Sequence, residues 1–168
     1  MGSADTNSGP ARILVVDDSA VSRAVVGYGL KRVGMRVDEA GGGAEALQLL
    51  AAHSYDVVIS DLCMPGVDGF AVLASIKVQS PTTEVIVLSG VQDVERAMHA
   101  LKLGAHAFLQ KPPAHPEQVL LTVRRALEMK RLRDLCTHLQ QQLDNAVPQL
   151  PQGLSARRAS QPKQPAAA

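Results

Sequence analysis

Residues 55–69 have the sequence YDVVISDLCMPGVDG, in which an apolar run ends in an acidic segment rich in turn residues. The first six residues are mostly apolar and β-branched, as is typical of a strand covered on both faces of a parallel sheet. Pro65, Gly66 and Gly69 then break the pattern and predict a loop. Open parallel sheets bind their ligands at the carboxyl ends of the strands, where Asp61 falls. An aspartate at this place can also simply cap the next helix, so the rest of the chain must decide between the two interpretations.

Three further predicted strands end in polar residues that can carry chemistry. Residues 13–16 lead into Asp17-Asp18, residues 84–88 into Ser89-Gly90, and residues 105–110 into Lys111-Pro112. If these strands are parallel neighbours, one edge of the sheet gathers three carboxylates, a hydroxyl and an ammonium group. Helical patterns separate the runs, and this alternation predicts a parallel sheet with helices on both faces.

Three crowded carboxylates predict a cation site. Like charges raise one another's pKa and resist joint ionisation. A hard divalent cation such as Mg²⁺ removes the conflict, since it prefers oxygen ligands and keeps several waters. Such a site has room for a phosphoryl group, whose oxygens the metal and Lys111 would neutralise. Asp61 is then a plausible nucleophile that forms an acyl phosphate.

The ordered motifs resemble one family. They are Asp17-Asp18 followed by Ser19, the string D-x-x-M-P-x-x-D-G-F from Asp61 to Phe70, Ser89-Gly90, Gly104-Ala105, and Phe108 with Lys111-Pro112. From Arg12 to Leu127 the chain resembles the receiver domain of two-component response regulators, in its chemotaxis-type, stand-alone form with a C-terminal helical extension. The resemblance implies an α/β, doubly wound, flavodoxin-like (βα)5 fold. Its five parallel strands would have the order 2-1-3-4-5, followed by an extended C-terminal helix.

The resemblance also implies the roles of the site residues. Asp61 would be phosphorylated by a sensor histidine kinase or a histidine phosphotransfer protein. Mg²⁺ would be bound by Asp18, by Asp61, by the backbone carbonyl of Cys63, and by Asp17 mainly through water. The protein would then be a phosphoacceptor switch rather than an enzyme, with only self-catalysed phosphotransfer and autodephosphorylation.

The same resemblance implies a switch around the phosphoryl group. Ser89 through its hydroxyl and Lys111 through its charge would be drawn to it. Phe108, which is also a normal core residue, would change rotamer into the space that Ser89 leaves. The bond from Lys111 to Pro112 would be cis, which positions the ammonium group.

Two other classes of protein compete with this interpretation. A haloacid dehalogenase-type phosphatase also uses a nucleophilic aspartate, Mg²⁺ and lysine, but its D-x-D motif follows the first strand. Here Asp17 and Asp18 are adjacent and the lone Asp61 follows the third strand. A flavodoxin-like cofactor protein would share the fold, but a hydroxyl-rich phosphate loop after Val16 and a flavin-stacking aromatic are both missing.

Composition limits the remaining possibilities. The 168 residues suffice for one domain with tails, and the low aromatic content predicts a core of Val, Leu, Ile and Ala. A net charge of +1 argues against a nucleic-acid partner. Cys63 and Cys136 have no metal-ligand spacing and suit a reducing cytosol. Since no segment reaches the apolar length of a membrane span, we expect a cytoplasmic protein without a membrane partner.

Four segments are expected along the chain. Residues 1–10 and 148–168 are expected to be disordered tails, 11–127 the receiver domain, and 128–147 a helical extension. In the fourth helix, Val94, Ala97 and Leu101 are expected to face inward. The extension carries an apolar stripe of Leu132, Leu135, Leu139 and Leu143. This stripe predicts either a short coiled coil that forms a homodimer or a helix that docks an unknown downstream protein.

Overall fold

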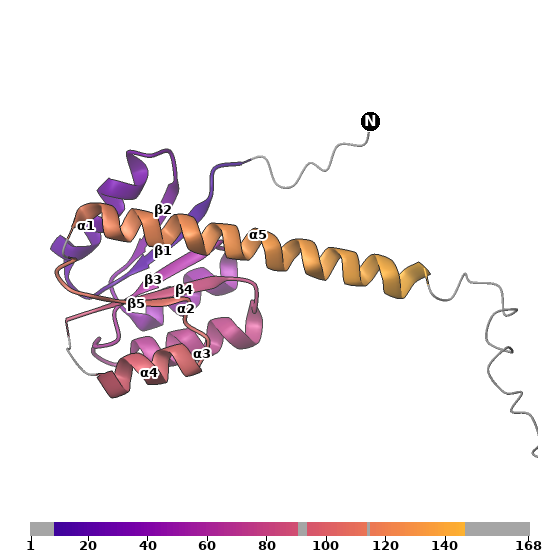
Figure 1. Cartoon of the computed structure of the whole chain (residues 1–168). Helices are drawn as coiled ribbons and strands as arrows, with labels where there is room; N and C mark the ends of the chain where they lie inside the picture. Colours follow the sequence, from indigo (N-terminus) through magenta and orange to yellow (C-terminus); the bar gives the residue numbers. More distant parts are fainter. Residues whose placement is uncertain (1–8, 91–93, 114, 147–168) are drawn as a thin grey trace, which may run out of the picture. The chain divides into compact units, whose positions relative to one another are not determined.

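Strands and helices alternate throughout the computed structural model, which describes residues 9–90, 94–113 and 115–146 (Figure 1). The strands are β1 (Arg12–Val16), β2 (Arg36–Ala40), β3 (Val57–Ser60), β4 (Glu84–Ser89) and β5 (Ala107–Gln110). The helices are α1 (Ala20–Lys31), α2 (Gly43–Ala52), α3 (Gly69–Gln79), α4 (Val94–Lys102) and α5 (Pro116–Ala146). The expected tail 148–168 and most of the tail 1–10 lie outside the described residues.

The five strands form one parallel sheet in the order β2-β1-β3-β4-β5. This is the expected doubly wound, flavodoxin-like order. The direction of strand addition reverses at β1, so β1 and β3 are neighbours although β2 separates them in the sequence. In sheets of this kind, ligands bind at the carboxyl ends of the strands at this reversal.

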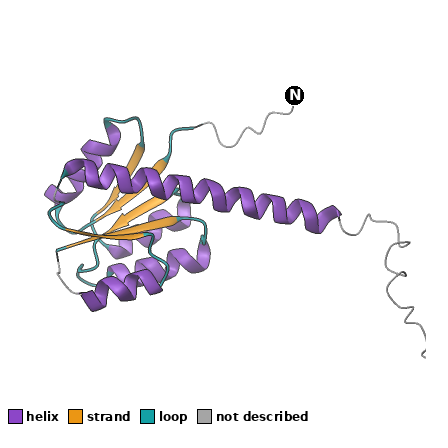
Figure 2. Cartoon of the chain, viewed as in Figure 1, coloured by secondary structure: helices purple, strands orange, loops and turns teal. Residues whose placement is uncertain are grey.

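Helices cover both faces of the sheet (Figure 2). Alternate side chains of a strand point to opposite faces, and the buried residues accordingly form two clusters. Leu14, Val58 and Val85 pack with residues of α2, α3 and α4, whereas Ile13, Val57 and Ile86 pack with residues of α1 and α5. The apolar runs of β1, β3 and β4 are therefore buried on both sides, which is why they lack polar alternation.

Helix α4 differs from the sequence prediction. Val94 is 72% exposed and Leu101 is 47% exposed, so the expectation that they face inward is wrong. Only Ala100 of the nine residues is buried. The small side chain of Ala100 lets the backbone of α4 pack closely on the core. With Ala100 turned inward, the larger side chains of Val94 and Leu101 point to solvent.

Polar side chains at the amino-terminal edge of the sheet form hydrogen bonds and ion pairs with one another. This edge is opposite to the strand ends that carry Asp17 and Asp61. The Tyr55 hydroxyl donates to Asp38 Oδ2 at 2.9 Å, and Arg12 contacts the same carboxylate. Burial and then this hydrogen bond raise the pKa of Tyr55 to about 12. Glu84 is fully buried, and Arg133 of α5 lies 2.8 Å from its Oε1. Helix α5 therefore still contacts the sheet six residues beyond Leu127.

The chain divides into two compact units, Met1–Asp134 and Leu135–Ala168. The described part of the second unit, 135–146, is the last portion of α5, and its leucines 135, 139 and 143 are exposed. Within the described ranges, no helix is both long and apolar enough to cross a membrane.

Candidate functional site

The topology brings two acidic strand endings side by side. Asp61 continues the ladder beyond β3, because its N–H donates to the Val16 carbonyl at 2.9 Å. Val16 is opposite Ser60 in the register of β1 and β3, so Asp17 and Asp61 follow at equivalent places. Their carboxylates meet at the strand ends, at the reversal point of the sheet.

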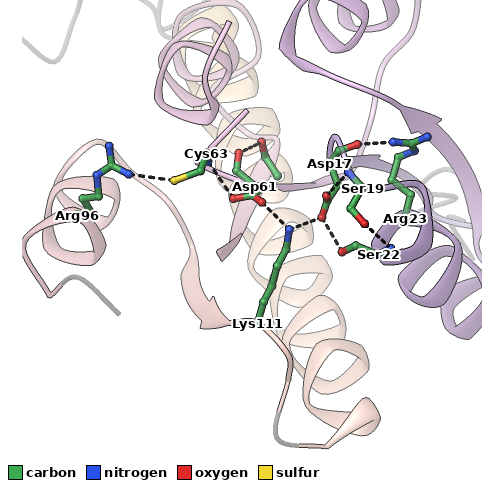
Figure 3. Close-up of polar contacts among 9 residues, drawn as sticks. Asp17, Ser19, Ser22, Arg23, Asp61, Cys63, Arg96 and Lys111 are labelled. Carbon is green, nitrogen blue, oxygen red and sulfur yellow. Dashed lines mark hydrogen bonds and ion pairs between the residues drawn. The ribbon is translucent and has the colours of Figure 1, made fainter. Parts of the chain in front are cut away.

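Lys111 joins these two carboxylates. Its backbone N–H donates to the Ser89 carbonyl at 2.9 Å, which fixes it at the end of β5 beside β4. Its Nζ contacts Asp17 Oδ2 and lies 2.5 Å from Asp61 Oδ2 (Figure 3). The peptide bond to Pro112 is cis, in agreement with the resemblance. One ammonium group thus bridges two acids from different strands.

Asp17 is the most heavily bonded acid of the three. Its carboxylate accepts hydrogen bonds from the Ser19 N–H at 2.9 Å and from the Ser22 hydroxyl at 2.6 Å. Burial alone would raise the pKa of Asp17, but the hydrogen bonds from Lys111, Ser22 and Ser19 outweigh it and lower the pKa. Burial likewise disfavours the Lys111 ammonium, yet the bonds to Asp17 and Asp61 raise its pKa. Both groups are therefore held in their charged forms.

The loop after β3 holds Asp61 through hydrogen bonds and close backbone packing. The Cys63 N–H donates to Asp61 Oδ1 at 2.9 Å, and Asp68 caps α3 by accepting from the Ala71 N–H. Gly66 has a φ of 77°, a left-handed conformation that favours glycine. A Cβ at Gly69 would run into the backbone carbonyl of Asp61. Glycine is therefore required at Gly69 for a steric reason, because helix α3 begins directly against the backbone of Asp61.

Asp18 completes a potential metal site. It is exposed, and carboxylate oxygens of Asp17, Asp18 and Asp61 all lie within 4.8 Å of one another. Oxygen ligands of this charge and spacing, open to solvent on one side, suit Mg²⁺ with part of its water shell. Cys63, whose carbonyl is expected to be a further ligand, lies in the loop directly beside Asp61.

Ser89 and Phe108 lie on the neighbouring strands. Ser89 is fully buried, and its hydroxyl has no hydrogen-bond partner among the residues that the structure describes. An unsatisfied buried hydroxyl is unfavourable by about 1–3 kcal/mol. Phe108 pairs in register with Val87, two residues before Ser89, and is partly buried against the core. The site thus contains a donor that is free to take a new acceptor.

Two kinds of contact at the site were not predicted from the sequence. Ser22 and Arg23, in the first turns of α1, bind the carboxylate and the carbonyl of Asp17. Their position just after the N-cap Ser19 could have indicated them. Arg96 of α4 lies 3.0 Å from the sulfur of Cys63, and no sequence signal connects two residues 33 positions apart.

An apolar groove opens beside the acidic site. It has a volume of about 830 Å³ and lies between α1 and the start of α5. Val21, Val25 and Tyr28 of α1 line it and are largely exposed. Ser19 and Lys111 line it as well, so the groove continues directly from the acidic site.

Comparisons with known proteins agree with this geometry. The sequence model of the response regulator receiver domain matches residues 13–124. The DNA-binding transcriptional regulator NtrC of Escherichia coli is 38% identical over 112 residues, which cover 67% of this chain and 24% of that protein. The chain spans about a quarter of the length of the curated relatives it matches.

Solved structures show the same relationship. A response regulator receiver domain protein from Clostridium thermocellum has a TM-score of 0.68 and 33% identity, covering 73% of this chain and 98% of that one. The chemotaxis response regulator CheY4 of Vibrio cholerae has a TM-score of 0.65 and 34% identity, covering 70% and 99%. With this fold, these acidic strand ends and these relatives, the chain belongs to the response regulator receiver domain family of two-component signalling proteins.

Proposed function

We propose that Asp61 accepts a phosphoryl group from the phosphohistidine of a sensor histidine kinase or a histidine phosphotransfer protein. The observation that carries the proposal is the position of Asp61, a carboxylate at a strand end that Lys111 bridges to Asp17. The family is a signalling switch rather than a conventional enzyme. Transfer of the phosphoryl group onto Asp61 and later hydrolysis of the acyl phosphate are therefore the only reactions proposed for this chain.

In the proposed transfer, a carboxylate oxygen of Asp61 attacks phosphorus. The phosphorus–nitrogen bond of the donor breaks, its electron pair goes to the imidazole nitrogen, and an acyl phosphate forms on Asp61. Lys111 neutralises charge on the phosphoryl oxygens, and the Cys63 N–H orients the attacking carboxylate. Asp17, Asp18, Asp61 and the Cys63 carbonyl would hold Mg²⁺, which supplies further charge neutralisation.

Ser89 and Phe108 are proposed to convert phosphorylation into a change of surface. The Ser89 hydroxyl lacks a partner within the described ranges, and a phosphoryl oxygen offers it a strong acceptor. Drawing Ser89 toward Asp61 frees space for Phe108, which is only partly buried. The phosphoryl group thereby favours one of two packings of the surface that α4, β5 and α5 make.

The groove along α1 is proposed as the seat of the phosphoryl donor. A donor histidine must reach Asp61, and the groove runs from Ser19 and Lys111 over exposed apolar side chains of α1. Exposed apolar patches beside a polar site are typical of protein interfaces. We place the exchange in the cytoplasm, since both free thiols, Cys63 and Cys136, are exposed and persist in a reducing compartment.

The signal is proposed to leave through a downstream protein or through the C-terminal helix. The exposed leucines at 135, 139 and 143 of the second unit support a helical seam with a second copy of the chain. Replacing Leu135 and Leu139 by Ala should then abolish dimerisation in sedimentation without reducing phosphorylation. A wild type that sediments as a monomer with and without an acyl-phosphate donor would favour docking of another protein.

Labelling with a radioactive small acyl-phosphate donor tests the phosphoacceptor. Wild type with Mg²⁺ should incorporate phosphate stoichiometrically, and chelation of Mg²⁺ or the change Asp61→Asn should abolish incorporation. Asp68→Asn is a matched control, because Asp68 lies in the same loop but caps α3. Continuous turnover of general phosphate esters would instead indicate a phosphatase.

A further inference from the structure

We propose that Glu84 of β4 anchors the C-terminal extension, because its ion pair with Arg133 holds residues 128–134 of α5 on the sheet. The Glu84 side chain is buried, and Arg133 Nη1 lies 2.8 Å from its Oε1. The segment 128–134 follows the part of the chain that matches the receiver family, which ends at residue 124. The phosphotransfer proposed at Asp61 uses neither residue of the pair, so the pair has a different role.

The apolar packing of α5 ends before this segment begins. Among the residues that the structure describes, Leu127 is the last of α5 to pack against the buried cluster on its face of the sheet. The larger apolar side chains that follow, Met129 and Leu132, are 40% and 58% exposed. Apolar burial therefore does not hold the segment 128–134 in place.

Polar contacts replace the apolar ones at this point. Lys130 Nζ lies 3.3 Å from Thr82 Oγ1, just before β4, and Arg133 reaches Glu84 in the first position of β4. Residues three apart lie on the same side of a helix, so both cations face the start of this strand. Two polar contacts thus hold the segment against the amino-terminal edge of the sheet.

Arg133 is the partner of Glu84 that the extension supplies. Neither Glu84 oxygen has an aligned hydrogen-bond partner within the described ranges, so ion pairs compensate its charge. His106 Nδ1 lies 3.4 Å from Oε2, but an imidazole is charged only when it is protonated. Lys77 of α3 acts on Glu84 at longer range and donates to the Thr83 carbonyl at 2.8 Å. A guanidinium group, in contrast, is charged at every physiological pH.

The buried charge opposes opening of the segment 128–134. If this part of α5 unwound, Arg133 would leave Glu84 and the buried carboxylate would lose much of its compensation. Local opening is therefore more costly than the exposed side chains of the segment alone would make it. The anchor gives the second unit of the chain, which begins at residue 135, a helical turn from which to continue.

Hydrogen exchange of the full-length protein, measured by mass spectrometry, tests the anchor. The amides of 128–134 should exchange about tenfold faster in both Arg133→Ala and Glu84→Gln, because opening no longer leaves a buried charge behind. The Arg133 side chain is 47% exposed, so the expected effect is smaller than for a fully buried pair. Arg131→Ala, which removes an exposed arginine two positions earlier, is the matched control and should exchange as wild type does.

The urea midpoint separates the two variants. Arg133→Ala keeps a buried carboxylate with less compensation and should lower the midpoint. Glu84→Gln removes the buried charge itself and should stay closer to wild type. Adding Glu84→Gln to Arg133→Ala should therefore recover part of the lost midpoint, while exchange of 128–134 stays fast.

Three results would overturn the inference. They are wild-type exchange of 128–134 in Glu84→Gln, an increase confined to Arg133→Ala, and an equal increase in Arg131→Ala. If Arg133→Ala does not fold, Glu84→Gln decides the question alone. The measurement needs neither a phosphoryl donor nor Mg²⁺, so its outcome is independent of the function proposed for Asp61.

Discussion

Replacing Lys111 by Met removes the one ammonium group that bridges two buried acids, while it keeps most of the volume of the side chain. The side chains of Lys111, Asp17 and Asp61 are only 18%, 4% and 10% exposed, so solvent screens their interaction poorly. With the ammonium group present, three carboxylates and one cation leave two net negative charges at the site. Without it, no ammonium group lies between the Asp17 and Asp61 carboxylates, and the cation that remains, Arg23, contacts the Asp17 carbonyl rather than a carboxylate.

Removing one partner of a buried ion pair destabilises a protein by about 3–5 kcal/mol. We therefore expect Lys111→Met to lower the free energy of unfolding by roughly that amount when a chelator removes divalent ions. Excess Mg²⁺ should return part of the loss, because ligands that bind the folded state stabilise it and a more negative site binds a cation more tightly. The magnesium dependence distinguishes lost charge compensation from lost packing.

Urea denaturation followed by circular dichroism measures the effect, with chelator and with Mg²⁺. The control is Lys102→Met, which changes an exposed lysine at the end of α4 and should stay within about 0.5 kcal/mol of wild type. A loss below about 1 kcal/mol in chelator would refute the reasoning. So would an equal loss in both buffers, since the cause would then be packing.

Three further predictions follow from the same geometry. Asp18→Ala should raise the stability of the metal-free protein by on the order of 1 kcal/mol, since it relieves carboxylate repulsion; equal or lower stability in urea denaturation would contradict this. Gly69→Ala should destabilise the fold by about 1–3 kcal/mol and reduce acyl-phosphate labelling, because its Cβ displaces the Asp61 backbone; unchanged labelling and stability would contradict this. In Tyr28→Phe, tyrosinate absorbance should report only Tyr55 and give a pKa of about 12. Since this pKa is raised on folding, the associated stability is complete below about pH 10 and is lost as the pH rises through about 12; a midpoint near 10 would contradict the bond to Asp38.

Much of the fold could be predicted because its signals are local. Strands buried on both faces have an uninterrupted apolar run, as at 57–59 of β3 and 85–88 of β4, and the turn residues from Pro65 to Gly69 break the pattern sharply. Parallel topology then brings Asp17, Asp61 and Lys111 together, although 94 residues separate the first from the last. The residues of the candidate site could therefore be predicted from the positions of the strand ends alone.

The remainder depends on tertiary contacts that a local pattern does not contain. Val94 and Leu101 have the spacing of a core face, but Ala100 is the residue that packs and thereby turns them outward. The contact of Arg96 with Cys63 depends on how α4 lies beside the loop after β3. Glu84 is a charged residue that begins a strand, and its burial becomes understandable only with Arg133 of α5 beside it.

The most direct test of the central claim is to locate the phosphoryl group on the protein. The full chain is incubated with a small acyl-phosphate donor and Mg²⁺. The intact mass is measured after rapid acid quenching, and peptide masses are measured after hydride reduction, which releases the phosphate and converts a phosphorylated aspartate to homoserine. The proposed function predicts an intact mass gain of one phosphoryl group and homoserine at Asp61, both lost with chelator. A phosphoryl group on any other residue, or none on the wild-type protein at saturating donor and Mg²⁺, would contradict it.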